Sequence, residues 1–149
     1  MIVVDSSVAM KWIVPEKHSA LALALFGDHI GRSEQILVPP LFVAEVSNVI
    51  RQQMRREGVP ARGAQSMLER LLAMTIVLWP LEDAAQRSLS RRALNIAAQY
   101  DLSATYDAHY LALAELMDCS AWTADERLLR QLNGRSPRLR SLETYQPAH

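Results

Sequence analysis

Cysteine, glycine, lysine and long apolar runs are all scarce in this chain of 149 residues. The single cysteine, Cys119, excludes an internal disulfide and so favours a reducing compartment. Five glycines, with no glycine-rich phosphate loop, argue against a nucleotide-binding fold. No apolar run approaches the roughly 20 residues that span a bilayer, and Asp5 and Lys11 interrupt the N-terminal stretch that a signal peptide would need. We therefore expect a cytoplasmic domain without a membrane segment.

The chain has equal numbers of acidic and basic residues, and nearly all of the basic residues are arginine. Sixteen basic residues offset 16 acidic ones, so the formal net charge is zero, which argues against non-specific nucleic-acid binding. However, 14 of the basic residues are arginine, whose planar fork binds phosphate bidentately. If several acids converge on one metal site, the remaining surface is net basic. A high-GC genome explains the same bias, so the arginine content alone assigns no function.

Short apolar runs alternate with longer helical segments along the whole chain. We expect strands at residues 2–4, 36–38, 75–79, 121–123 and 139–142. We expect helices from Ser6 or Ser7 to Pro15 and at about 18–26, 41–56, 60–73, 82–99, 104–117 and 125–134. This alternation predicts an α/β fold: one domain over residues 1–149, with a five-stranded, mostly parallel sheet flanked by helices on both sides. Residues from about 143 onward are expected to form a loose tail.

Two acidic residues follow predicted strands. Asp5 comes directly after the first strand, and Asp125 lies just beyond the fourth. Ligands of parallel α/β sheets bind beyond the carboxyl ends of the strands, so both acids are expected at the functional edge. Aspartate is also common at helix N-caps, and Asp125 directly precedes a predicted helix. A capping role for Asp125 therefore stays open beside a functional one.

Two further acids lie on the apolar sides of predicted helices. Glu45 falls at the edge of a stripe that includes Phe42 and Val49, and Asp107 shares a face with Leu111. Carboxylates are rarely placed against a core unless an arginine or a metal ion pairs with them. No basic residue lies three or four positions from Asp107, so a local helix ion pair does not explain that acid. Four acids from four separate elements favour a shared site.

Four clustered carboxylates would raise one another's pKa values unless a counter-charge is present. A divalent cation supplies that charge. Oxygen ligands without histidine or thiolate favour Mg²⁺ or Mn²⁺ over zinc. Mg²⁺ also keeps several waters, which suits a site that receives a phosphate.

Each of the four acids sits in a short segment of recognisable sequence. In chain order these are Val4–Ala9 with Lys11 and Trp12, then Pro40–Asn48, Tyr106–Ala114 and Trp122–Leu128. In order and spacing, the four segments resemble the PIN-domain ribonucleases of the VapC type, the toxin half of bacterial toxin–antitoxin pairs. The resemblance covers nearly the whole chain. The stretches at about 27–34 and beyond 134 match nothing specific.

The resemblance implies a metal-dependent endoribonuclease with one or two Mg²⁺ ions, for which Mn²⁺ can substitute. Its catalytic and metal-binding residues would be Asp5, Glu45, Asp107 and Asp125. Ser7, Asn48 and Thr123 would orient the metal ligands or contact phosphate. The resemblance also implies an RNA substrate, a homodimer, and a cognate antitoxin protein whose C-terminal segment covers the active-site groove. A larger toxin–antitoxin assembly stays open.

Other functional classes fit the same scaffold less well. A receiver domain needs an acidic pair after the first strand and a strand-end lysine, and the only lysines are Lys11 and Lys17. The common aspartyl phosphatases need a second aspartate two residues after the first, where this chain has Ser7. A PIN-fold module that binds RNA, protein or metal without cleavage stays open, because retained ligands do not prove turnover.

Overall fold

A five-stranded parallel sheet forms the centre of the protein. The computed structural model describes residues 1–148, so His149, the last residue of the expected tail, lies outside the described residues. The strands are β1 (Ile2–Val4), β2 (Ile36–Val38), β3 (Val77–Leu78), β4 (Ala121–Thr123) and β5 (Leu139–Ser141). Their order across the sheet is β3-β2-β1-β4-β5, and each pairing is parallel. The predicted α/β class and strand number are confirmed.

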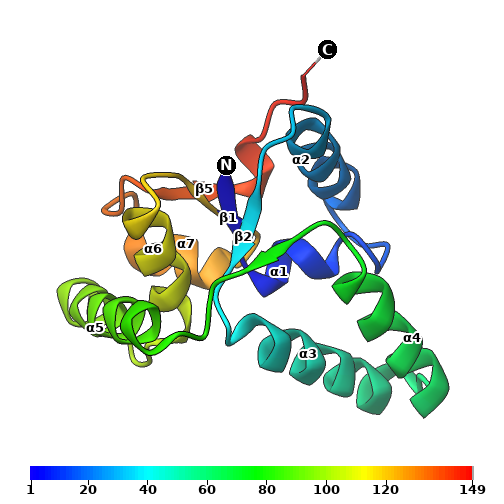
Figure 1. The fold of residues 1–149 in the computed structure, drawn as a ribbon. Helices are drawn as coiled ribbons and strands as arrows, with labels where there is room; N and C mark the ends of the chain where they lie inside the picture. Colours follow the sequence, from blue (N-terminus) through cyan, green and yellow to red (C-terminus); the bar gives the residue numbers. More distant parts are fainter. Residues whose placement is uncertain (149) are drawn as a thin grey trace.

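Helices connect the strands and cover the sheet (Figure 1). They are α1 (Ser6–Met10), α2 (Ser19–Gly31), α3 (Phe42–Glu57), α4 (Ala61–Leu72), α5 (Asp83–Tyr100), α6 (Tyr106–Leu116) and α7 (Glu126–Leu132), followed by the 3₁₀ turn η1 (Leu142–Thr144). Figure 1 shows α5 and α6 lying side by side, and α3 and α4 forming a helical hairpin elsewhere on the sheet. Each predicted helix is present, and α2 runs five residues beyond its expected end. None of the helices in the described chain is both long and apolar enough to cross a membrane.

The strand order reverses next to β1. The chain first builds outward through β2 and β3, and then crosses to the other side of β1 to form β4 and β5. Such a reversal is where parallel α/β sheets place their ligand sites, because the connections leave the two carboxyl ends in opposite directions. In the β1–β4 register Val4 pairs with Trp122, so the next residues, Asp5 and Thr123, lie beside each other.

The centre of the sheet is buried and its β3 edge is not. Every residue of β1 and β2 is at most 5% exposed, as expected for strands covered on both faces. In contrast, β3 pairs only with β2 and contains two residues instead of the five predicted, which are 38% and 47% exposed. The physical reason is its edge position beside a three-residue partner strand, which leaves few backbone groups for pairing. Trp79 still donates its backbone N–H to Val38 O at 2.9 Å.

The C-terminal segment is attached to the domain, which differs from the loose tail predicted from the sequence. Tyr145 packs its ring edge-on against Trp122, with 5.3 Å between ring centroids. The Tyr145 hydroxyl donates to Asp28 Oδ2 at 2.5 Å, and the backbone N–H of Ala148 donates to the same oxygen at 2.8 Å. These two donors also lower the pKa of Asp28. The segment after β5 is therefore anchored to Trp122 of β4 and to Asp28 of α2.

We predict that Tyr145→Ala lowers the free energy of unfolding by about 1–2 kcal/mol, because it removes an aromatic pair and opens space beside Trp122. Tyr145→Phe should cost less, because it keeps the ring and loses only the hydrogen bond to Asp28. Urea unfolding measures both. The exposed Tyr106→Phe is the matched control, and equal stability of Tyr145→Ala and the wild type would show that the tail is indeed loose.

Candidate active site

Asp5 lies at the carboxyl end of the central strand and is 8% exposed. Its position is fixed locally, because it is the N-cap of α1 and its Oδ1 accepts from Val8 N at 3.0 Å. Oδ1 also accepts from Ser7 Oγ at 2.6 Å, and Oδ2 accepts from Thr123 Oγ1 at 2.5 Å. Three donors therefore hold the most buried acid of the site.

The same hydroxyls join β1 to the loop before α7. Ser7 Oγ accepts from Ala124 N at 2.8 Å, and Thr123 Oγ1 accepts from Asp125 N at 2.9 Å. The two hydroxyl oxygens lie 3.5 Å apart. Ser7 and Thr123, both predicted to lie around the site, thus contact Asp5 directly and orient the chain that leads to Asp125.

Glu45 reaches the site from the first turn of α3. Its Oε2 accepts a short hydrogen bond from the hydroxyl of Tyr110, which lies on α6 and is almost fully buried. The sequence alone gives Tyr110 no role, because a tyrosine on an apolar helix face is typical of a core. The partner of its hydroxyl becomes visible only when α3 and α6 are placed together.

Asp107 and Asp125 meet across the start of α6 and α7. Asp125 is the N-cap of α7, and its Oδ1 accepts from Arg127 N at 2.7 Å and Leu128 N at 3.2 Å. The capping role left open in the sequence is thus present, and Oδ2 remains for other partners. The Arg127 guanidinium lies 4.0 Å from Asp107 Oδ2 and 3.9 Å from Asp125 Oδ2. Arg127 is the partner of Asp107 that local spacing could not supply.

Three of the four acids resist ionisation. Burial raises the pKa of Asp5 from 3.8 to about 6, against the opposing effect of its hydrogen bonds. Burial likewise raises the pKa of Glu45, with contributions from the charges of Asp5 and Asp107. The pKa of Asp107 is raised by burial and then by the charge of Asp125, and Arg127 partly offsets this. These mutual influences identify the four carboxylates as one electrostatic cluster that lacks positive charge.

The cluster is not a closed metal cage. Across residues 1–148, no three His, Cys, Asp or Glu side chains stand close enough to form a ready-made metal site. The cause is visible in the contacts, because Asp5 is occupied by three donors, Glu45 by Tyr110, and one oxygen of Asp125 by its helix. A cavity of about 270 Å³ opens beside Glu45 and Asp107.

Asn48 does not join this network. Its side chain is exposed on α3, and within the described part of the chain no hydrogen bond links it to the four acids. Residues missed by the sequence analysis are Tyr110 and Arg127. For Arg127 a clue existed, since it lies two residues after Asp125 in the first turn of a capped helix.

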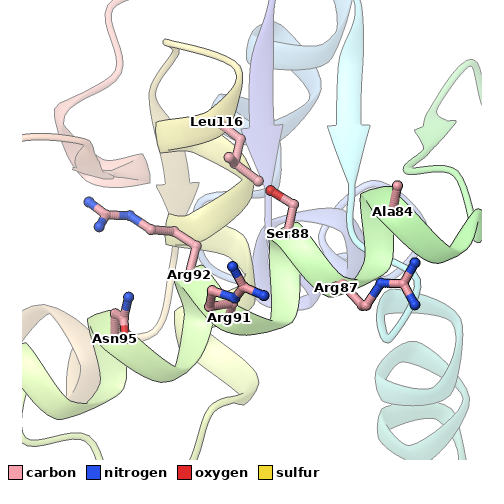
Figure 2. Close-up of a pocket in the computed structure, with 7 residues that line it drawn as sticks. All are labelled: Ala84, Arg87, Ser88, Arg91, Arg92, Asn95 and Leu116. Atoms are coloured by element: carbon pink, nitrogen blue, oxygen red, sulfur yellow. The ribbon is translucent and has the colours of Figure 1, made fainter.

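A second hollow, of about 430 Å³, lies on the outer side of α5 and is a poor catalytic candidate. Figure 2 shows Arg87, Arg91 and Arg92 spread along α5, with Arg87 and Arg92 reaching away from each other. Leu116 borders this hollow at the far end of α6, about 13 Å along the helix from Asp107. None of the four clustered acids lines it.

Known proteins are similar to this chain in sequence and in fold. VapC ribonuclease Mb0985 of Mycobacterium bovis and ribonuclease VapC9 of Mycobacterium tuberculosis are each 30% identical over 128 residues, which cover 86% of this chain and 88% of each relative. The crystal structure of PAE2754 from Pyrobaculum aerophilum has a TM-score of 0.65 at 21% identity, covering 96% of this chain and 90% of that one. This last likeness bears on the fold alone.

The sequence model of the PIN domain matches residues 2–133, a range that contains the four acids and the whole sheet except β5. This match confirms the family predicted from the four motifs. Together with the relatives over most of its length, it shows that the chain belongs to the PIN-domain family.

Proposed function

We propose that this protein is a divalent-metal-dependent endoribonuclease that hydrolyses RNA phosphodiester bonds, and that it is the toxin of a type II toxin–antitoxin pair. One observation carries the proposal: carboxylates from four separate elements form one under-compensated cluster at the switch point of the sheet. The names of the mycobacterial relatives, both ribonucleases, supply the reaction class. A module that binds without cleaving is the second candidate, favoured by the saturated hydrogen bonding of Asp5.

The donor set fits Mg²⁺, with Mn²⁺ as a substitute. All four side chains offer hard carboxylate oxygens, which Mg²⁺ prefers. Burial and mutual repulsion raise the pKa of Asp5, Glu45 and Asp107, so a cation that enters the cluster is favoured by the charge it neutralises. Among the described side chains, Arg127 is the one cation within 4.0 Å of these acids, and its single charge does not balance four carboxylates.

Each residue has a role that follows from its contacts. Asp5, Glu45, Asp107 and Asp125 would hold one or two metal ions. A divalent ion held by them would supply Lewis-acid chemistry, because it would polarise the scissile phosphate and lower the pKa of a water. Hydrolysis would add that water across the P–O3′ bond, so that its hydroxyl remains on phosphorus as a 5′-phosphate and its proton ends on the 3′ hydroxyl. Ser7 and Thr123 orient Asp5, and Tyr110 orients Glu45. Asn48, being exposed, would contact the RNA backbone.

The partners follow from the same proposal. An RNA strand needs cationic contacts outside the acidic cluster. Arg91 of α5 (Figure 2) offers one, because it makes no salt bridge among the described residues, whereas Arg87 and Arg92 pair with Asp83 and Glu115. The cognate antitoxin would cover the acids and block access of RNA. The exposed edge strand β3 supports a homodimer, since unpaired strand edges are usually covered. We place the activity in the cytoplasm, where one unpaired cysteine is stable.

We predict that Asp5→Asn lowers RNA cleavage by at least about a hundredfold, because it removes the central carboxylate of the metal cluster. The assay incubates partner-free protein with total cellular RNA in Mg²⁺ or Mn²⁺, and EDTA should abolish cleavage as well. The exposed Asp83→Asn on α5 is the matched control. Intact RNA in every lane, from folded protein, would favour the binding module instead.

We predict that Asp5→Asn makes the metal-free protein more stable at pH 7.5, by about 1–3 kcal/mol. The folded-state pKa of Asp5 is raised from 3.8 to about 6, so protonated Asp5 contributes stability that is present below about pH 4 and lost as the pH rises through 6. Urea unfolding in EDTA from pH 4 to 8 measures this. Equal stability of the variant and the wild type at pH 7.5 would contradict it.

We predict that Mn²⁺ at pH 7.5 raises the melting temperature of the wild type and leaves that of Asp5→Asn nearly unchanged, because bound metal stabilises the folded state only where the ligands remain. Differential scanning calorimetry measures the shift. A similar shift in both proteins would show that the metal binds elsewhere.

A further inference from the structure

The cavity beside Glu45 and Asp107 has a second wall that carries no acid. The loop between α5 and α6 supplies Leu102 and Ser103, the first residue of α6 supplies Tyr106, and α7 supplies Arg127 and Gln131. At about 270 Å³ the cavity is slightly smaller than the pockets that enclose drug-sized ligands. Its size suits one planar ring system with an attached phosphate better than a longer ligand.

Tyr106 is the exposed tyrosine of the site. Its side chain is 63% exposed, whereas Tyr100 and Tyr110 are nearly fully buried. It immediately precedes Asp107, so an accessible aromatic ring lies one residue away from a carboxylate of the cluster. An aromatic ring at the rim of a cavity offers a flat face for stacking, which every nucleobase can use.

Gln131 and Arg127 lie four residues apart on α7 and therefore on one face of it. Gln131 Nε2 donates to the backbone carbonyl of Asp101 at 3.0 Å, which fixes the amide and leaves Oε1 as an acceptor. The Arg127 side chain is 76% exposed and contacts Asp107 and Asp125 only at about 4 Å. Its guanidinium is thus available for a phosphate once a metal ion neutralises the two acids.

We propose that this cavity binds a single unstacked nucleobase of the RNA. The base would lie next to the scissile phosphate, which would be held at the four carboxylates. Tyr106 stacks on the base, Gln131 Oε1 accepts a hydrogen bond from its edge, and Arg127 holds the adjoining phosphate. This inference rests on the proposed ribonuclease function and assigns Tyr106, Gln131 and Arg127 as the residues that bind the nucleotide at the cleaved position. A paired base is already stacked on its neighbours and has its edge occupied.

The arginine-lined hollow on α5 does not compete for this role. Its lining offers three guanidinium groups and no aromatic ring (Figure 2). It also lies at the opposite end of α6 from the acids. Its chemistry suits the sugar–phosphate backbone, whereas that of the cavity beside the acids suits a base.

The test separates binding from cleavage. Fluorescence anisotropy would measure binding of a labelled single-stranded RNA of mixed sequence and of the matching duplex to the otherwise wild-type protein, both in Ca²⁺, which binds carboxylate oxygens as Mg²⁺ does and replaces it to limit cleavage during the measurement. We expect the single strand to bind more tightly, Tyr106→Ala to weaken that binding by about tenfold, and Tyr106→Phe to stay within about twofold. Arg127→Ala should weaken binding and reduce its salt dependence.

Two matched controls lie outside the cavity. Leu94→Ala removes an exposed apolar side chain from α5, and Arg130→Ala removes an exposed arginine of α7 that pairs with Glu126. Both should bind RNA within about twofold of the parent, because neither residue lines the cavity. Circular dichroism melting curves would show that each variant is folded.

The outcomes distinguish this inference from the proposed function. Cleavage by the otherwise wild-type protein tests the nuclease, and the anisotropy series tests the base pocket. If the protein cleaves RNA and Tyr106→Ala binds and cleaves as well as its parent, the pocket is wrong and the nuclease stands. If no RNA is cleaved but Tyr106→Ala loses single-strand binding, the base-pocket inference is supported and the proposed ribonuclease function is contradicted. Duplex bound as tightly as single strand would overturn the pocket in either case.

Discussion

The buried carboxylate of Asp5 is the constraint around which the carboxyl edge of the sheet is organised. A carboxylate with 8% exposure needs donors, and it receives them from the first turn of α1 and from β4. The hydroxyls that supply these donors also accept from the backbone before α7. Burial of one acid thereby fixes β1, β4 and the start of two helices relative to one another.

The hydrogen bonds around Asp5 fix its position but do not offset the cost of ionising a buried carboxyl group. Its pKa remains raised to about 6, and the pKa values of Glu45 and Asp107 are raised as well. A protein selected only for stability would pair or replace such acids. Here Arg127 approaches Asp107 and Asp125 at about 4 Å and leaves the deeper acids without a cation. The unbalanced charge is what supports the proposed binding of a divalent ion.

Three residues within little more than one turn of α6 lie at the candidate site. Tyr106 faces the cavity, Asp107 belongs to the acidic cluster, and Tyr110 anchors Glu45 from across the site. Because residues three and four apart share a helix face, one rigid element sets the distances between the proposed substrate contact, the proposed metal ligand and the hydroxyl that binds Glu45. The close packing of α6 on β1 and α5 keeps that element in register with Asp5.

The sequence by itself determined the succession of strands and helices along the chain and the parallel α/β class, and it singled out the four acids as candidates, because apolar periodicity and strand-end position are local properties. It also indicated that Asp107 needs a partner. Only the tertiary structure decided that this partner is Arg127, that Tyr110 binds Glu45, that Asn48 stays exposed, and that Tyr145 anchors the tail on Asp28. Periodicity shows which face of an element is apolar. Which residues of two such faces meet depends on how distant elements pack, and no local pattern encodes that.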